Sequence, residues 1–347
     1  MACRKKIDAG IISILIGIIT MLVMSCSSDK SKDHQLMKDL PDTARAITKK
    51  IAEDPGNASL YYERAKLLIA TNHNSLAMKD LNKAIELEPD MAVYYQEKAD
   101  LLWIQGSVRE ALANLKTARL KNRKDPDILL KLAEVTFIIG DYKNSQRYLD
   151  TLRDNFDANS EGWVIRGFVF LQTEDTLSAI KSFEEATRID PDNYRAFLQL
   201  GVIYTHLKNP VCLEYYQTAL ELKPGSAEVY YNMGWYYQQN NDFNRAIELY
   251  NHLLTMKDGG GLKPNAYYNL GYLHIQMKMW SEARDYFGKA IQLNPKYVEA
   301  YYAKGFAHEM LGDIMNAKAY YEEALKLRPS YPTAYNALQR INNTMNR

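Results

Sequence analysis

The chain of 347 residues repeats one unit of about 34 residues eight times between Ala58 and Tyr331. Position 8 of the unit is small in every copy: Ala65, Ala99, Ala133, Gly167, Gly201, Gly234, Gly271 and Gly305. Position 20 is small as well: Ala77, Ala111, Ser145, Ala179, Cys212, Ala246, Ala283 and Ala317. A unit of this length cannot bury its own hydrophobic face and must stack on its neighbours. The period therefore predicts an array of helix–turn–helix units instead of one globular core.

Large side chains complement these small ones. Position 4 carries Tyr61, Tyr95, Leu129, Trp163, Phe197, Tyr230, Tyr267 and Tyr301. Position 24 carries Leu81, Leu115, Leu149, Phe183, Tyr216, Tyr250, Phe287 and Tyr321. Alternating large and small residues interlock across a helix pair. Five units have a proline after the second helix, where its missing N–H and fixed φ end the helix: Pro89, Pro191, Pro224, Pro295 and Pro329.

This combination of aromatic, small and proline residues resembles the signature of the tetratricopeptide repeat (TPR) family. The resemblance implies an all-α fold, a right-handed α-solenoid of stacked helix–turn–helix TPR units. The eight predicted repeats cover residues 58–91, 92–125, 126–159, 160–193, 194–226, 227–260, 264–297 and 298–331. The flanking segments 42–57 and 332–347 each align with half a repeat. We expect them to be N- and C-terminal capping helices that shield the ends of the array from water.

The first 25 residues have the layout of a secretory signal. The basic residues Arg4, Lys5 and Lys6 precede a largely apolar run from Ala9 to Val23. The stretch resembles a bacterial lipoprotein signal, which implies cleavage after residue 25 and lipidation of Cys26. A retained transmembrane anchor is the alternative, although the apolar run is shorter than the ~20 residues that span a bilayer.

Residues 27–33 are polar and small, which predicts that residues 26–41 form an extended polar tether between the lipid and the repeats. Ser27, not aspartate, follows the cysteine. In the lipoproteins of double-membraned bacteria this difference favours sorting to the outer membrane. We therefore expect a lipid-anchored protein of the bacterial cell envelope, with the outer membrane as its location.

The composition argues against nucleic-acid binding and against catalysis. Without the signal, basic and acidic residues nearly balance, so no strong field attracts a nucleic acid. The sequence lacks the common short catalytic and metal-binding motifs, and we expect no enzyme activity, no cofactor and no metal. His274 and His308 occupy matched positions in successive units, where a packed histidine is favoured over a metal ligand. Cys212, at a small position, is expected to pack as alanine does.

In a TPR array the first helix of each unit lines the concave wall. Six aromatic residues fall at positions 5 and 9 of units six to eight: Tyr231, Trp235, Tyr268, Tyr272, Tyr302 and Phe306. Three amide side chains occupy position 6 of successive units: Gln199, Asn232 and Asn269. Exposed aromatic residues contribute strongly to binding, and an amide ladder offers donors and acceptors to a peptide main chain. The alternative is that these rings pack between adjacent helices or lie under the protein's own chain.

The expected function is that of a membrane-anchored scaffold or adaptor. It would bind protein partners or extended peptide segments in its groove during envelope assembly, secretion or protein turnover. The alternative is a carbohydrate-binding accessory lipoprotein whose groove aromatics stack on sugar rings. Recognition of chaperone tails is not expected, because position 5 lacks the lysine of carboxylate-clamp TPR proteins. The sequence also allows a homo-oligomer, since the ends and outer faces of solenoids often self-associate.

Overall fold

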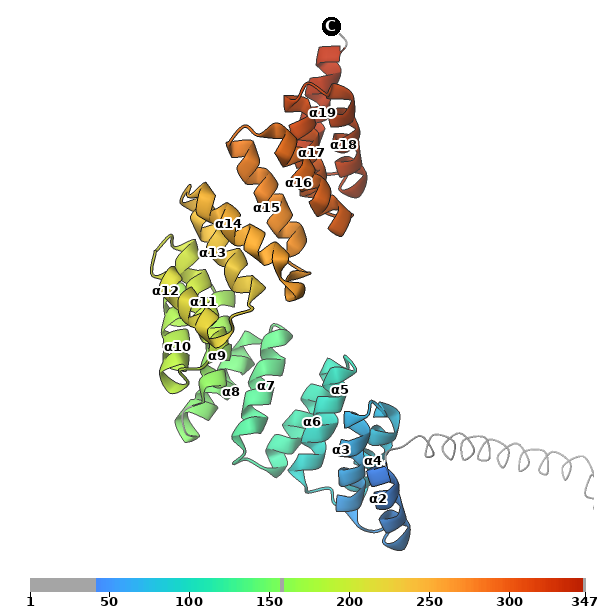
Figure 1. Ribbon diagram of the computed structural model, residues 1–347. Helices are drawn as coiled ribbons and strands as arrows, with labels where there is room; N and C mark the ends of the chain where they lie inside the picture. The colour runs from blue at the N-terminus through green and yellow to red at the C-terminus, as the bar shows by residue number, and fades with distance from the viewer. Residues whose placement is uncertain (1–41, 157–158, 346–347) are drawn as a thin grey trace, which may run out of the picture. The chain divides into compact units, whose positions relative to one another are not determined.

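The computed structural model describes residues 42–156 and 159–345, and within them it contains helices and no strand (Figure 1). The eighteen α-helices are α2 (Asp42–Glu53), α3 (Ala58–Ala70), α4 (Asn74–Leu87), α5 (Ala92–Ile104), α6 (Val108–Lys121), α7 (Pro126–Ile138), α8 (Tyr142–Asn155), α9 (Ser160–Gln172), α10 (Thr176–Ile189), α11 (Tyr194–His206), α12 (Cys212–Leu222), α13 (Ala227–Gln239), α14 (Phe243–Thr255), α15 (Lys263–Gln276), α16 (Trp280–Leu293), α17 (Val298–Met310), α18 (Ile314–Leu327) and α19 (Pro332–Met345). A short 3₁₀ helix, η1 (Lys257–Gly259), precedes α15. The prediction of an all-α solenoid is confirmed.

The predictions made for the N-terminal residues concern a part of the chain that the structure does not describe. The signal over residues 1–25, the lipidation site Cys26 and the tether over residues 26–41 all lie outside the described residues. Among the described helices, none combines the length and the apolar character that a membrane span requires.

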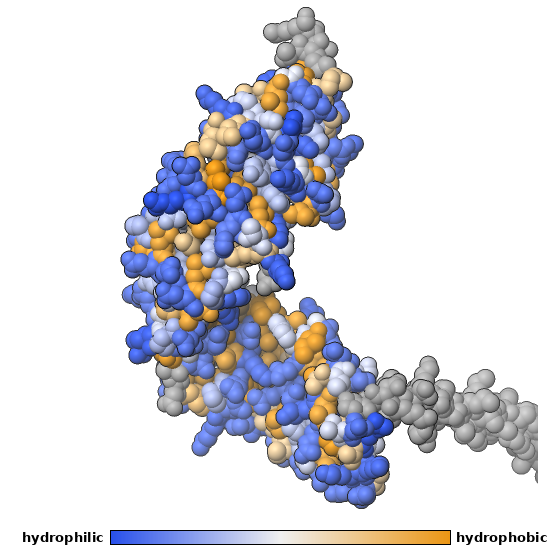
Figure 2. Space-filling view, viewed as in Figure 1, coloured by the Kyte–Doolittle hydropathy of each residue, from blue (hydrophilic) through white to orange (hydrophobic). Residues whose placement is uncertain are grey.

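The chain divides into two compact units. Unit 1 ends at Thr151 and contains α2 to α7 with most of α8, while unit 2 begins at Leu152 and contains α9 to α19. Inside each unit, a helix packs mainly against the helix before it and the helix after it in the chain. The buried side chains therefore form a row of small hydrophobic clusters. Figure 2 shows that the hydrophobic side chains reaching the surface lie among hydrophilic ones.

Positions 8 and 24 change together between the two units. In unit 1 the residue at position 8 is alanine and its buried counterpart at position 24 is leucine, as in Ala65 and Leu81. In unit 2 position 8 is always glycine and position 24 is always phenylalanine or tyrosine. A Cβ atom added to Gly271 would lie 2.7 Å from Cε1 of Phe287. The aromatic ring thus fills the space that the missing side chain leaves.

The turn inside each repeat contains one residue with a left-handed backbone at position 15: Asn72, Gly106, Gly140, Glu174, Lys208, Asn241, Lys278 and Gly312. Four of the following helices are preceded by an aspartate whose carboxylate accepts a backbone N–H, as Asp242 does from Arg245 at the start of α14. This turn therefore fixes the direction of the side chains that follow the first helix of each repeat.

The first and last described helices cover the ends of their units. Ala44 and Ile51 of α2 are buried in unit 1. Ala337 of α19 is buried in unit 2, where Arg340 also forms an ion pair with Glu309 of α17 at an Nη2–Oε1 distance of 2.8 Å. Both helices therefore occupy the places at which an uncovered repeat would expose hydrophobic side chains.

Candidate functional site

All nine groove residues predicted from the sequence lie in unit 2. Gln199 is on α11, and the other eight are on α13, α15 and α17, the first helices of three successive repeats (Figure 1). We call the six aromatic residues among them the aromatic face: Tyr231, Trp235, Tyr268, Tyr272, Tyr302 and Phe306. Five of these side chains are half-buried, and Tyr272 is exposed, with 42% of its surface accessible.

The three tyrosines at position 5 are held by the aromatic residue at position 24 of their own repeat. The Tyr268 ring centroid lies 5.5 Å from that of Phe287 and 5.1 Å from that of Tyr297. The ring centroids of Tyr302 and Tyr321 likewise lie 5.5 Å apart. Burial raises the pKa of Tyr268 to about 12. The alternative that these rings pack inside the protein therefore holds for part of each ring, while the remaining part stays accessible.

Two of the three aromatic residues at position 9 pack against the repeat that precedes them. The ring centroids of Trp235 and of His206, at the end of α11, lie 4.9 Å apart. Those of Phe306 and of Trp280, at the start of α16, lie 6.3 Å apart. Tyr272 has no ring partner among the described residues and is the most exposed member of the aromatic face. Rings held in this way lose little conformational freedom when a ligand binds.

The three predicted amide rungs are not equivalent. Asn269 is buried, and its Nδ2 donates to the hydroxyl groups of Tyr250, at 3.0 Å, and of Tyr231, at 3.3 Å. Both amide hydrogens are thus used inside the protein. Gln199 and Asn232 are half-buried and make no side-chain hydrogen bond within the part of the chain that the structure describes. The ladder predicted for a peptide main chain is consequently interrupted at α15.

A small cavity beside Tyr272 was not foreseen from the sequence. Its volume is about 200 Å³, and we call it the amide pocket after its lining residues: Gln238, Gln239, Asn241, Phe243, Tyr272 and Gln276. The run Gln238-Gln239-Asn240-Asn241 was the available signal. The sequence alone does not show that the end of one first helix meets the middle of the next.

The histidines and the cysteine take part in packing. The Nδ1 atom of His274 lies 2.7 Å from the carbonyl oxygen of Leu270, and that of His308 lies 3.0 Å from a carboxylate oxygen of Asp313. Within the described residues, no group of three histidine, cysteine, aspartate or glutamate side chains is placed to hold a metal ion. Cys212 is buried, and burial raises the pKa of its thiol.

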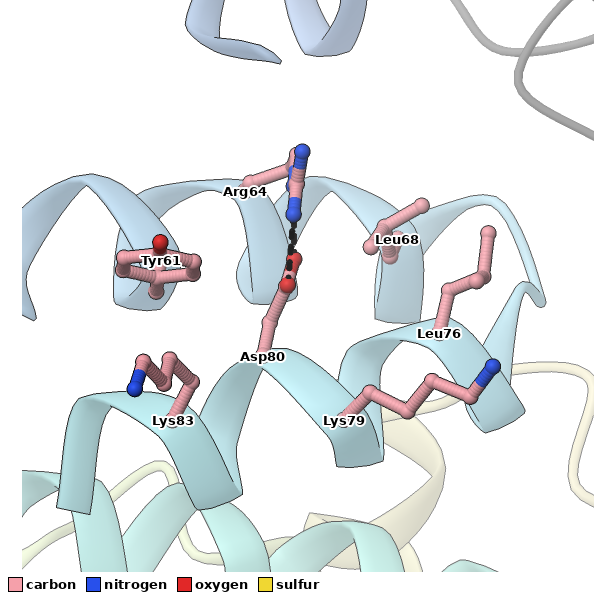
Figure 3. Close-up of a pocket in the computed structure, with 7 residues that line it drawn as sticks. All are labelled: Tyr61, Arg64, Leu68, Leu76, Lys79, Asp80 and Lys83. Carbon is pink, nitrogen blue, oxygen red and sulfur yellow. Dashed lines mark hydrogen bonds and ion pairs between the residues drawn. The ribbon is translucent and has the colours of Figure 1, made fainter. Parts of the chain in front are cut away.

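Unit 1 contains a second cavity, of about 270 Å³, between α3 and α4 (Figure 3). Its one carboxylate, Asp80, points at Arg64, which donates to it through Nε and Nη2 at 2.7 Å each. The Nη1 atom of Arg64 also donates to the hydroxyl of Thr48 on α2 at 3.0 Å. These bonds of Arg64 tie three helices together, and they engage the carboxylate that lines the cavity.

Comparison with known proteins agrees with the fold. Models described as tetratricopeptide repeat match residues 58–91, 160–193, 215–248, 264–297 and 298–331. The general transcriptional corepressor ssn6 of Schizosaccharomyces pombe is 27% identical over 153 residues, which cover 43% of this chain and 13% of the corepressor. The type IV pilus assembly protein PilF of Pseudomonas aeruginosa is 30% identical over 143 residues, which cover 40% of this chain and 55% of PilF. The chain thus spans less than two thirds of the length of either relative.

A solved structure of a tetratricopeptide repeat protein from Parabacteroides merdae has the same architecture. Its TM-score is 0.56 at 14% identity, and the alignment covers 72% of this chain and 98% of that chain. Helix pairs with this period, these small and aromatic positions and these matches have one explanation: the chain is a tetratricopeptide repeat protein.

Proposed function

We propose that this protein is a membrane-anchored scaffold that binds protein partners or extended peptide segments on the aromatic face of unit 2. The observation that carries the proposal is the row of six aromatic side chains on three successive first helices. Packing against the repeats holds their rings, and Tyr272 projects furthest into solvent. Pre-positioned aromatic residues bury large areas of a partner at a low entropic cost.

The equivalent positions of unit 1 have a different chemistry. They include the charged residues Lys66, Asp100 and Glu134, of which two have partners within the unit: Asp100 pairs with Lys131, and the Lys66 ammonium lies 5.6 Å from the centroid of the Tyr62 ring. A partner would therefore find its hydrophobic anchors on unit 2. Charged groups that are already paired and exposed contribute little to affinity.

The anchor at Cys26 rests on the N-terminal sequence, which resembles a lipoprotein signal. A lipid there would hold the repeats at the envelope membrane and raise the local concentration of bound partners. The similarity to PilF, a type IV pilus assembly protein, supports a role in assembling structures of the cell envelope.

The test is chemical crosslinking in intact cells followed by mass spectrometry of the captured proteins. A Trp235→Ala/Phe306→Ala variant removes two anchors from opposite ends of the aromatic face. Tyr335→Ala is the matched control, because this tyrosine on α19 is 54% exposed and lies outside that face. We expect capture of the partners by the double variant to fall at least about tenfold, since the loss of an aromatic anchor typically costs ~2 kcal/mol or more of binding free energy. Unchanged capture by the double variant at equal expression would contradict the assignment.

The anchor has its own test. Cells labelled with an alkyne fatty acid should transfer the label to the wild-type chain and not to a Cys26→Ser variant, which should also leave the membrane fraction. A Cys26→Ser chain that still carries the label would show that lipidation occurs elsewhere or that the label is nonspecific.

A further inference from the structure

We propose that the amide pocket of unit 2 is a binding site for one ring of a neutral sugar. The site goes beyond the protein-binding function proposed above and does not depend on it. Its lining combines side-chain amides with two aromatic rings and contains no charged residue.

The pocket is built where one repeat meets the next. Gln238 and Gln239 end α13, Asn241 occupies the left-handed position of the turn, and Phe243 begins α14. Tyr272 and Gln276, one helical turn apart on α15, form the opposite wall. Because the turn is fixed by the N-cap of α14, the two walls present their side chains in a defined arrangement.

The amides of the pocket are free to bind. Gln239, Asn241 and Gln276 are exposed, and none of them makes a side-chain hydrogen bond within residues 42–156 and 159–345. The Oε1 atom of Gln238 accepts from the hydroxyl of Tyr250 at 3.0 Å, which orients its amide and leaves the NH₂ group as a donor. Each free amide carries both donors and an acceptor, so it can serve both lone pairs and protons of hydroxyl groups.

The two aromatic rings and the absence of charged side chains restrict the chemical class of the ligand further. Tyr272 is 42% exposed and Phe243 is half-buried, so each has ring surface accessible to an apolar C–H face. The nearest carboxylate in the sequence, that of Asp242, accepts from the backbone of Arg245 and pairs with its guanidinium at 3.1 Å. A ligand with hydroxyl groups around an apolar ring face, and without charge, matches this surface.

The geometry favours a compact ligand over an extended peptide. A cavity of about 200 Å³ is smaller than the ~300–1,000 Å³ of pockets that enclose drug-sized molecules. The nearby amide of Asn269, at position 6 of the same repeat as Tyr272, adds no donor to this pocket, because both of its hydrogens are engaged by tyrosines. The free amides are grouped at one turn, where they surround a single small volume.

Ligand-detected NMR with the full chain tests the site, using maltose, cellobiose and N,N′-diacetylchitobiose as probes. Tyr272→Ala and Gln276→Ala remove one ring and one amide from the pocket. Tyr335→Ala and Gln339→Ala, on α19, are matched controls because these side chains are exposed as well. Circular dichroism of each variant verifies the helical content, which exposed substitutions should leave intact.

The proposal expects saturation transfer to at least one disaccharide, with an affinity that falls about tenfold in both pocket variants and in neither control. No transfer to any of the three probes would overturn it, as would equal affinity in the pocket variants and the wild type. If the sugars fail while Tyr272→Ala loses crosslinked protein partners, the pocket belongs to the protein-binding face. In that case the sugar site is rejected and the proposed function stands.

Discussion

Replacing Gly271 by alanine tests why glycine and an aromatic ring occur together in unit 2. Helix propensity alone favours the substitution, because alanine in a helix interior is about 1 kcal/mol better than glycine. Packing opposes it: the new Cβ would meet three atoms of the Phe287 ring at 2.7, 2.8 and 2.9 Å. The ring is fully buried, so it cannot turn away into solvent.

Overpacking a well-filled core costs about 1–3 kcal/mol, and a buried ring places Gly271→Ala near the upper end. After the gain in helix propensity, we expect unfolding of unit 2 to become easier by about 2 kcal/mol. Urea denaturation followed by circular dichroism measures this change. Gly225→Ala is the control, because a Cβ there would meet no atom within 4 Å.

Adding Phe287→Leu should restore much of the lost stability. Alanine with leucine is the combination that unit 1 uses, as in Ala65 and Leu81, which are both fully buried. A double-mutant cycle of Gly271→Ala and Phe287→Leu should therefore give a favourable coupling of about 1–2 kcal/mol. The reasoning is refuted if Gly271→Ala alone is as stable as the wild type, or if the two substitutions are additive.

Three further predictions concern buried polar groups. Arg64→Met should destabilise unit 1 by about 3–5 kcal/mol because it leaves the carboxylate of Asp80 buried without a cation, and Asp80→Leu in the same chain should recover most of the loss in urea denaturation. Asn269→Ala should cost about 1–3 kcal/mol, since two tyrosine hydroxyls lose their donor, and a smaller loss would show that water replaces the amide. Burial raises the pKa values of Tyr94 and Tyr268 to about 12, so the stability they contribute is complete below pH 10, their usual pKa, and is lost as the pH rises through 12. Alkaline titration of the tyrosine absorbance should show this late phase, and its absence would mean that both hydroxyls reach solvent.

The sequence predicts the fold well because the repeat encodes contacts between helices that adjoin in the chain. Small residues at position 8 and large ones at position 24 meet within one helix pair, so spacing alone brings Gly271 to Phe287. The site is less accessible to such reasoning. Asn269 was predicted to face a ligand, but the hydroxyl of Tyr250, from the preceding repeat, takes its amide hydrogen. Contacts between repeats depend on how the units twist against each other, which a single-unit pattern does not specify.

The packing of each helix mainly on its chain neighbours has a consequence for how the molecule forms and evolves. Such contacts close short loops, so the chain has a low contact order, and folding is expected to be fast and able to begin at more than one repeat. For the same reason, duplication or loss of one whole repeat inside a unit would disturb only the two interfaces beside it. A chain built in this way can lengthen or shorten its surface in steps of one repeat while the remaining pairs keep their packing.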